Sequence, residues 1–414
     1  WFTFLTIIGL AIGIAGVIFS TLYWKDETSY DQWNQDKDRI YETLSVFPIA
    51  GAEWPTSVEP LPRYLKEKSD KVENYCWFEG WYGKETFYVD QKKVYIEGIV
   101  STDQNFFDFI PFKFIKGNVN DFRKNKYGIA LEESEAIKIF GNENPVGKIL
   151  TNYDGRKMPI YGVFKGNKFS GFQPKIVISN IYTRFDDIKD NWGSYGPGLL
   201  IKLKDPKYKS EIEKLGTDLF YENSTLKNAK AEGIAVEEFL KIYEPVKVKL
   251  QALKDTRLNA KVSKLPEGMG NKLFLQINLG LSYLILILSM INYVNLSTAQ
   301  AIRRAKEVGI RKIVGASKRN IILQFIIETT ITTVLAFFVA LALVEVTLSS
   351  YNVLINKNLE IDFIDFIPNL ILIFTIVVVI AGIFPAIYVS NFKELNVLKG
   401  NFSRSKNGIW LRNA

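Results

Sequence analysis

Four long stretches of the chain consist almost entirely of uncharged, mainly apolar residues, and charged segments separate them. The first has 24 residues. As an α-helix at about 1.5 Å per residue it would span roughly 36 Å, which exceeds the roughly 30 Å of a bilayer core. The second has 30 residues and would reach about 45 Å, so we expect it to project beyond the bilayer or continue as a stalk. The pattern predicts four transmembrane helices, over residues 1–24, 273–302, 321–348 and 366–392.

The segment 25–272, between the first two predicted spans, shows shorter periodicities. Residues 61–72 have apolar positions at helical spacing and predict an amphipathic helix. Residues 85–100 alternate as two strands joined by a tight turn. Residues 128–164 have the pattern of a strand, a short helix, a Gly/Asn/Pro turn and a closing hairpin. The predicted fold class is therefore a membrane protein of four transmembrane α-helices, with a large α+β domain inserted between helices 1 and 2.

The distribution of charge predicts the orientation of these segments. The loop 303–320 holds seven Lys or Arg residues and the tail 393–414 holds five, whereas the loop 349–365 holds one against three acids. Because loops rich in Lys and Arg face the cytosol, we expect both termini inside and residues 25–272 outside. That large domain carries 39 basic and 37 acidic residues, so the net charge of +8 belongs mainly to the cytosolic face. A nucleic-acid partner is therefore not expected.

The composition excludes several kinds of site. Cys76 is the only cysteine and the chain has no histidine, which rules out an internal disulfide, the usual zinc ligand sets and Ser-His or Cys-His pairs. The segment 141–149, GNENPVGKI, does not fit a phosphate-binding loop. Five residues instead of four separate its glycines, and an isoleucine stands where the magnesium-binding Ser or Thr belongs. A hydrolase would depend on carboxylates or lysines whose pairing one sequence does not show. We predict no catalytic residue and no metal site.

Small and polar residues inside the predicted spans are candidates for contacts between helices. Gly9 and Gly13 form a GxxxG motif, with Gly16 close behind, and small residues at this spacing let a second helix approach closely. The alternative is that these are ordinary membrane glycines. Asn292 and Asn295 lie three residues apart near the inner end of the second span, and amides in lipid usually bond across helices. The alternative there is a polar helix end that already reaches the interface.

Four sequence elements spread over nearly the whole chain form a set: IIGLAIGIAG (7–16) with SYDQWNQDKDRIYETL (29–44), SEAIKIFGNENPVGK (134–148), INYVNLSTAQAIRRAKEVGIRKIVGASKRNIILQFIIE (291–328) and GIFPAIYVSNFKELNVLKG (382–400). This set resembles the permease subunits of MacB/FtsX-type ABC transporters, and the third element is its most specific part. The resemblance implies one span, a large periplasmic domain and three further spans in a bacterial inner membrane. The sequence departs from the family pattern at Glu394, where a proline is expected.

The resemblance also implies a function, that of a non-catalytic permease subunit coupling ATP hydrolysis to movement of its periplasmic domain, for export, lipoprotein handling or mechanotransmission. Because no Walker or signature motif is present, ATP and Mg are expected on a separate cytosolic ABC ATPase subunit, with no cofactor in this chain. The other expected partners are membrane lipid and a second permease half, either an identical chain or a fused second half. Trp1 lies inside an apolar run, which indicates that the true start precedes it. The alternative function is a membrane-anchored receptor or scaffold that binds a ligand without energy coupling.

The loop 303–320 is where the resemblance implies the helix that docks on the ATPase. Within KEVGIRKIVGA, four apolar side chains alternate with charged ones, which insertion into the membrane does not require. We expect a short helix flanked by Gly309 and Gly315 whose apolar side chains enter a groove on the partner, while Glu307 and Arg311 pair at its rim. The alternative is that the cations only set the membrane orientation. The predicted coupling residues are Glu307, Val308, Gly309, Ile310, Arg311, Lys312, Ile313, Val314, Gly315 and Ala316.

Overall fold

The protein is described by a computed structural model that covers the backbone of residues 2–81, 83–181, 185, 189–303, 305–361 and 363–390. The predicted tail 393–414 lies outside these residues. The chain divides into two compact units. We name residues 1–26 with 272–414 the helical unit, and residues 27–271 the α+β unit.

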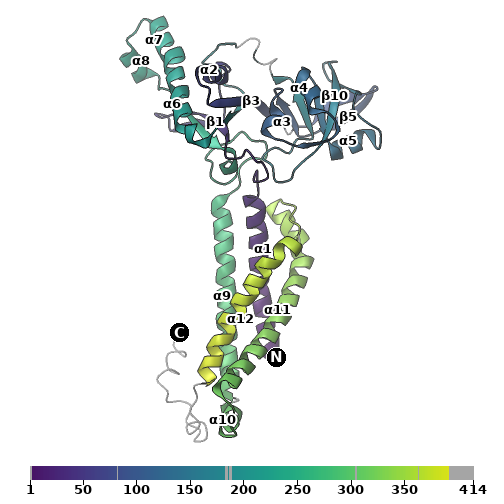
Figure 1. Cartoon of the computed structure of the whole chain (residues 1–414), viewed down its shortest axis with the longest axis vertical. Coiled ribbons are helices and arrows are strands. Elements are labelled where there is room, and N and C mark those ends of the chain that lie inside the picture. Colours follow the sequence, from purple (N-terminus) through teal and green to yellow (C-terminus); the bar gives the residue numbers. More distant parts are fainter. Residues whose placement is uncertain are drawn as a thin grey trace. The chain divides into compact units, whose positions relative to one another are not determined.

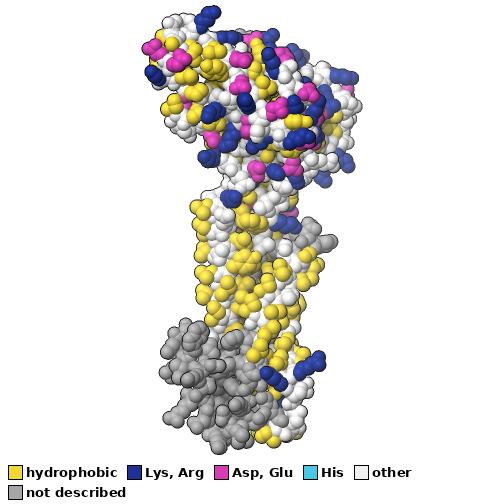
Figure 2. All heavy atoms as spheres, turned by 60° about the vertical axis from the view of Figure 1, so that its left-hand side comes forward, with side chains coloured by type: hydrophobic (Ala, Val, Ile, Leu, Met, Phe, Trp, Pro, Cys, Tyr) yellow, Lys and Arg dark blue, Asp and Glu magenta, His cyan; other side chains and the backbone are white. Residues whose placement is uncertain are grey.

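The helical unit consists of long apolar helices with one short helix between two of them (Figure 1). Hydrophobic side chains cover much of the surface of its long helices (Figure 2). Among the described residues, three helical segments are long and apolar enough to cross a membrane, namely Thr3–Thr28, Lys272–Gln300 and Lys318–Ile355. The fourth predicted span falls on α12, whose described apolar part, Ile367–Ile383, is shorter. The helices are α1 (Phe2–Thr28), α9 (Lys272–Arg303), α10 (Ala305–Ile313), α11 (Lys318–Ile355) and α12 (Phe363–Ser390).

The α+β unit is built on thirteen hydrogen-bonded strands in the order β13-β1-β12-β3-β6-β11-β8-β10-β9-β4-β5, with β2 paired to β1 and β7 paired to β10. Two pairs, β10 with β8 and β11 with β6, are parallel, and the other pairs are antiparallel. The strands are β1 (Ile40–Phe47), β2 (Ala52–Trp54), β3 (Val72–Trp81), β4 (Glu85–Val89), β5 (Lys92–Ile96), β6 (Ile99–Thr102), β7 (Lys113–Gly117), β8 (Ile129–Glu132), β9 (Ile149–Asn152), β10 (Lys157–Lys165), β11 (Ile176–Ser179), β12 (Gly198–Leu203) and β13 (Lys247–Ala252).

Short helices complete the α+β unit. The α-helices are α2 (Pro60–Lys68), α3 (Phe106–Phe109), α4 (Val119–Lys124), α5 (Glu133–Phe140), α6 (Lys209–Phe220), α7 (Leu226–Glu232) and α8 (Val236–Ile242). Among the described residues, the α+β unit also has two 3₁₀ turns, η2 (Pro206–Tyr208) and η4 (Leu253–Asp255), and one π-helix, η3 (Tyr221–Thr225). The mixture of helices with a largely antiparallel sheet confirms the predicted α+β class.

Local patterns predicted several of these elements. The hairpin β4–β5 is confirmed, and its two turn residues, Asp90 and Gln91, both have positive φ angles, as a two-residue hairpin turn requires. The strand, helix and hairpin predicted over residues 128–164 are also confirmed. The predicted helix over residues 61–72 was too long, because Ser69 is extended and Val72 opens β3. Val72 is buried like the apolar face of the helix, so the periodicity did not reveal the boundary.

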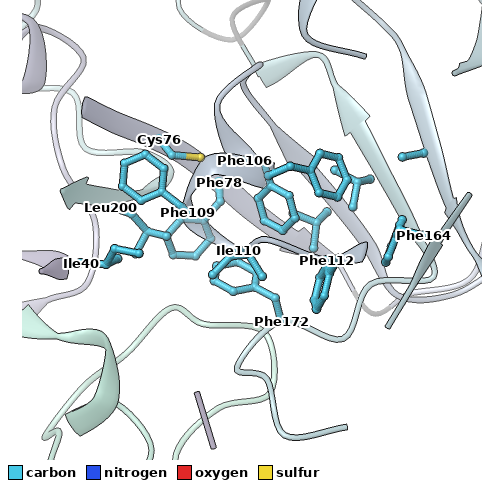
Figure 3. Packing of buried hydrophobic residues seen from close by; sticks show 14 of the residues in the cluster. Ile40, Cys76, Phe78, Phe106, Phe109, Ile110, Phe112, Phe164, Phe172 and Leu200 are labelled. Carbon is cyan, nitrogen blue, oxygen red and sulfur yellow. The ribbon is translucent and has the colours of Figure 1, made fainter. Parts of the chain in front are cut away.

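One core cluster of the α+β unit is rich in phenylalanine (Figure 3). The rings of Phe106 and Phe172 meet edge to face with centroids 5.3 Å apart, and those of Phe112 and Phe164 stack at 5.2 Å. Burying one such side chain stabilises a fold by roughly 1.5–3 kcal/mol, and favourable ring geometry adds about 0.5–1.5 kcal/mol per pair. This cluster therefore fixes the short helix α3 against the sheet.

Candidate functional site

The candidate site is the short helix α10 between the long helices α9 and α11. Glu307 and Arg311 stand one turn apart on it and form an ion pair with an N–O distance of 2.5 Å, an arrangement that supports a helix. Gly315 ends the turn that follows, since its φ of +105° lies in a region that favours glycine. Ser317 then caps α11 by accepting a backbone N–H of its first turn. The sequence thus specifies a helix, a break and a new helix within a few residues.

An apolar contact attaches α10 to the two helices that follow it. Val308 is buried and packs in a cluster with Ile321 and Phe325 of α11 and Ala386 of α12. A small apolar cluster of this kind holds the short helix in one orientation, because turning it would expose Val308 to solvent. One face of α10 is therefore occupied by its own chain.

A polar chain provides a second attachment. The Arg311 guanidinium donates to the side-chain oxygen of Gln324 at 2.7 Å, and the Gln324 amide donates to a Glu328 carboxylate oxygen at 3.1 Å. Together with the Glu307–Arg311 pair, these bonds connect α10 to the first three turns of α11. Gln324 was missed by reasoning from sequence. Its position offered a signal: a polar residue at the start of an apolar helix, four positions before Glu328, can form a hydrogen bond with that glutamate.

Three apolar side chains remain on the outside of this anchored segment. Ile310 is 56% exposed, Ile313 59% and Val314 82%. The burial of Gly309 and of the Lys312 side chain lies outside what the structure describes, and Ala316 is half-buried. These exposed apolar residues of one short helix and the turn after it, beside the charged pair of Glu307 and Arg311, form a surface that could enter an apolar groove.

The structure differs from the predicted arrangement at two positions. Gly309 lies inside α10 instead of flanking it, so the helix begins at Ala305, four residues earlier than the predicted flank. Val308, which we expected to face a partner, faces α11 and α12. The second difference arises because α10 packs on later helices, and this contact decides which of the apolar residues point outward.

The glycines of α1 are placed differently from one another. A Cβ atom added at Gly13 would lie 3.0 Å from Ser289 Oγ and 3.1 Å from Leu286 Cα, so α9 approaches α1 closely at this point. A Cβ atom at Gly9 or Gly16 would have nothing within 4 Å. Within this chain, the close approach therefore depends on Gly13.

Asn292 and Asn295 have exposed side chains on α9. Other polar residues join the helices. Ser20 of α1 bonds to Ser282 and to Asn278 Oδ1 of α9, the latter at 3.1 Å, and the Asn278 amide donates to the Tyr351 hydroxyl of α11 at 3.2 Å. In the sequence, the only sign of this cluster is that polar residues interrupt the apolar stretches of all three helices.

Buried carboxylates in the α+β unit have perturbed pKa values. Desolvation raises the pKa of Glu42 and of Asp103 to about 7, and that of Asp31 to about 6. Backbone N–H groups oppose these shifts: that of Lys264 donates to Glu42 at 2.6 Å, and that of Trp77 to Asp103 at 2.8 Å. These groups make the stability of the unit depend on pH. Across the described residues, no three His, Cys, Asp or Glu side chains gather where they could hold a metal ion.

Comparison with known proteins places both units in one family. The family model of the MacB-like periplasmic core domain matches residues 3–215, just over half of the 414 residues, and that of the FtsX-like permease C-terminal region matches residues 279–397. The chain belongs to the MacB/FtsX-type ABC transporter permease family. It is a membrane permease with an extracytoplasmic α+β domain.

Curated relatives of this chain are identical to it at about a quarter of the aligned positions. The macrolide export ATP-binding/permease protein MacB of Aggregatibacter actinomycetemcomitans is 24% identical over 233 residues, which is 55% of this chain and 32% of that protein. MacB of Neisseria meningitidis serogroup A is 23% identical over 245 residues, 58% of this chain and 34% of that protein. The alignments with these relatives thus span about a third of their length.

The solved structures similar to this chain include two bacterial domains. A domain of a permease protein from Porphyromonas gingivalis aligns with a TM-score of 0.40 and 16% identity, over 59% of this chain and 98% of that domain. The periplasmic region of MacB from Actinobacillus actinomycetemcomitans aligns with a TM-score of 0.35 and 15% identity, over 54% of this chain and 94% of that region.

Proposed function

We propose that this chain is the membrane subunit of an ABC transporter and that α10 docks on a cytosolic ATPase subunit, which holds ATP and Mg. Hydrolysis there would drive a conformational change of the extracytoplasmic domain, used for export, lipoprotein handling or mechanotransmission. The chain itself would be non-catalytic. A second permease half, an identical chain or a fused half, would complete the transporter.

One observation carries this proposal: Ile310 and Ile313 are exposed on a helix that its own chain holds in place, and Val314 is exposed in the turn that follows it. A segment that served only to set membrane orientation would need positive charge and no ordered apolar surface. Burying one Ile or Val side chain contributes roughly 1.5–3 kcal/mol, whereas an exposed ion pair contributes about 0–1 kcal/mol. Docking through these three side chains would thus account for both their exposure and their fixed orientation.

We further propose four spans in a bacterial inner membrane, with both termini in the cytosol and residues 25–272 in the periplasm. Cysteine labelling in intact cells tests this orientation. An impermeant thiol reagent should modify Asn358→Cys and leave Lys318→Cys unmodified, and the native Cys76 is buried and should not react. Labelling of Lys318→Cys from outside would reverse the orientation and remove the coupling proposal with it.

The docking itself is tested with Ile310→Asp in the full-length protein, expressed together with its ATPase. Burial of this side chain in a groove predicts that the variant binds the ATPase about 10-fold to 100-fold more weakly. The measurements are the amount of ATPase that copurifies and the rate of ATP hydrolysis in nanodiscs, at equal membrane levels of permease.

Two control variants separate docking from general damage. Val353→Asp places the same new charge on an exposed residue near the other end of α11, and Lys318→Ala removes a surface cation near α10. Both should retain the ATPase within about threefold. If Ile310→Asp behaves like these controls, α10 is no docking element, and a receptor or scaffold without energy coupling becomes the better interpretation.

A further inference from the structure

The α+β unit contains an aromatic pocket far in sequence from the coupling helix. Its volume is about 260 Å³, and it lies between the segment 192–195 and the helices α6, α7 and α8. Trp192, Phe220 and Phe239 line it with buried side chains, and Tyr243 lines it with a half-exposed one. The Trp192 and Phe220 rings meet edge to face with centroids 5.2 Å apart, and those of Phe239 and Tyr243 lie 4.6 Å apart. The pocket thus presents several aromatic rings to any molecule inside it.

A local irregularity shapes one wall of this pocket. Between α6 and α7 the backbone forms the π-helix η3, Tyr221–Thr225, in place of regular α-helical turns. Ser224 and Thr225 of this segment line the pocket, together with Asn228 of α7. Short π-helical segments inside α-helices are rare and occur frequently at functional sites.

The charge of the lining has a single sign. Glu232 and Glu244 line the pocket, and no Lys or Arg does so among the described residues, although the whole chain has 52 of them. The Glu244 carboxylate accepts the backbone N–H groups of Ile49 and of Ala50, the latter at 3.0 Å. These donors are neutral, so they fix the carboxylate in position without cancelling its charge. Glu232 is exposed at the end of α7 and has no ion pair within the described part of the chain.

We propose that this pocket binds a small organic cation, an ammonium group with apolar substituents. The faces of aromatic rings attract such cations, and two carboxylates in a site without basic residues add to the attraction. The same carboxylates would repel an anion, and a neutral apolar ligand would gain nothing from them. Burial raises the pKa of the lining phenol Tyr195 to about 12, so this side chain stays neutral and adds no charge to the lining.

This inference concerns the α+β unit alone and does not depend on α10 or on an ATPase. A permease that fails to bind an ATPase could still bind the cation, and the reverse also holds. The two proposals therefore succeed or fail separately.

The test compares two probes of nearly the same shape on the full-length protein in dodecyl maltoside, a detergent without an ammonium group. Choline carries a quaternary ammonium, and 3,3-dimethyl-1-butanol replaces its nitrogen by carbon. Saturation-transfer NMR titrations give the Kd of each. We expect choline to bind saturably and about tenfold more tightly than the neutral alcohol.

Three variants locate the site. Glu232→Gln removes one charge and Tyr243→Leu removes one ring, and each should weaken choline binding about fivefold. Glu237→Gln, on an exposed position of α8 outside the lining, serves as the charge control and should leave the Kd unchanged. The proposal is overturned if choline does not bind saturably, if the alcohol binds equally well, or if both pocket variants keep the wild-type Kd.

Discussion

Replacing Arg257 should destabilise the α+β unit more than any single exposed ion pair could. The Arg257 guanidinium makes two bonds to the Glu27 carboxylate, both 2.8 Å, and the Arg257 and Glu27 side chains are only 11% and 2% exposed. The guanidinium also donates to the backbone oxygens of Glu267 and Gly268, at 2.9 and 3.2 Å. The pair is therefore buried, bidentate and further hydrogen-bonded.

The position of this pair gives it a structural role. Glu27 lies in the last turn of α1, and the backbone oxygen of Arg257 accepts the N–H of Gly270 at 2.7 Å, two residues before α9 begins. A Cβ atom at Gly270 would lie 2.2 Å from a Glu27 carboxylate oxygen, so a side chain has no room there. Arg257 thus holds together the two points where the chain enters and leaves the α+β unit.

The magnitude follows from what each substitution leaves behind. Arg257→Met keeps most of the volume but leaves the Glu27 carboxylate buried without its partner, which costs about 3–5 kcal/mol. For a domain of this size, such a loss lowers the Tm by about 10 °C. Combining Arg257→Met with Glu27→Gln removes both charges and should recover at least about 2 kcal/mol relative to the sum of the single variants.

The assay is thermal unfolding of the full-length protein in detergent, followed by intrinsic fluorescence. Lys254→Met is the matched control, because Lys254 and Asp38 form an ion pair at 2.6 Å whose partners are 43% and 48% exposed. It should cost less than about 1 kcal/mol. Equal effects of Arg257→Met and Lys254→Met, or additive single effects in the double variant, would refute the reasoning.

Three further outcomes are expected. Because Glu42 keeps its proton up to pH about 7 in the fold but only to about 4.5 when unfolded, this residue alone should contribute a loss of up to about 1.4 kcal/mol of unfolding free energy per pH unit between these values. Glu42→Gln should reduce the slope of the wild-type profile by this share in denaturant titrations, with Asp103 and Asp31 supplying the rest, and an unchanged slope would contradict the assignment. Gly13→Leu should lower the Tm through a loss of about 1–3 kcal/mol, whereas Gly9→Leu should not, and equal shifts would exclude the close contact. Asn292→Leu with Asn295→Leu should leave the Tm of the single chain unchanged and weaken its pairing with a second permease half in crosslinking, since both amides are exposed here.

Much of the fold could be predicted because its determinants are local. The long helices follow from uncharged stretches, and the hairpin β4–β5 follows from strand alternation around a two-residue turn. What remained hidden depends on distant partners. Glu27 and Arg257 are 230 positions apart, and neither is unusual in its own segment. The helix boundary near Val72 was hidden for a different reason. A buried position on a strand and a buried position on a helix are both occupied by apolar residues, so the residue type alone does not distinguish them.

The candidate site shows the same division. The sequence between Glu307 and Ala316 predicts a helix with both charged and apolar side chains, but its apolar residues are spread over more than one face. Which of them is buried is decided by Ile321, Phe325 and Ala386, the last of which is 78 positions from Val308. The periodicity of so short a segment does not show which face of the helix is buried. That is decided by contacts with other helices, which the local sequence does not contain.

The two attachments of α10 have a mechanical consequence. To move away from α11, α10 would have to expose Val308 and break the bond from Arg311 to Gln324. Exposing the valine alone would cost about 1.5–3 kcal/mol, and the bond adds about 0.5–1.5 kcal/mol. A displacement of the exposed Ile310 by a docked partner is thus transferred more readily to α11 and α12 than absorbed within the short segment. Under the proposed function, the helices that follow α10 would then receive the movement first.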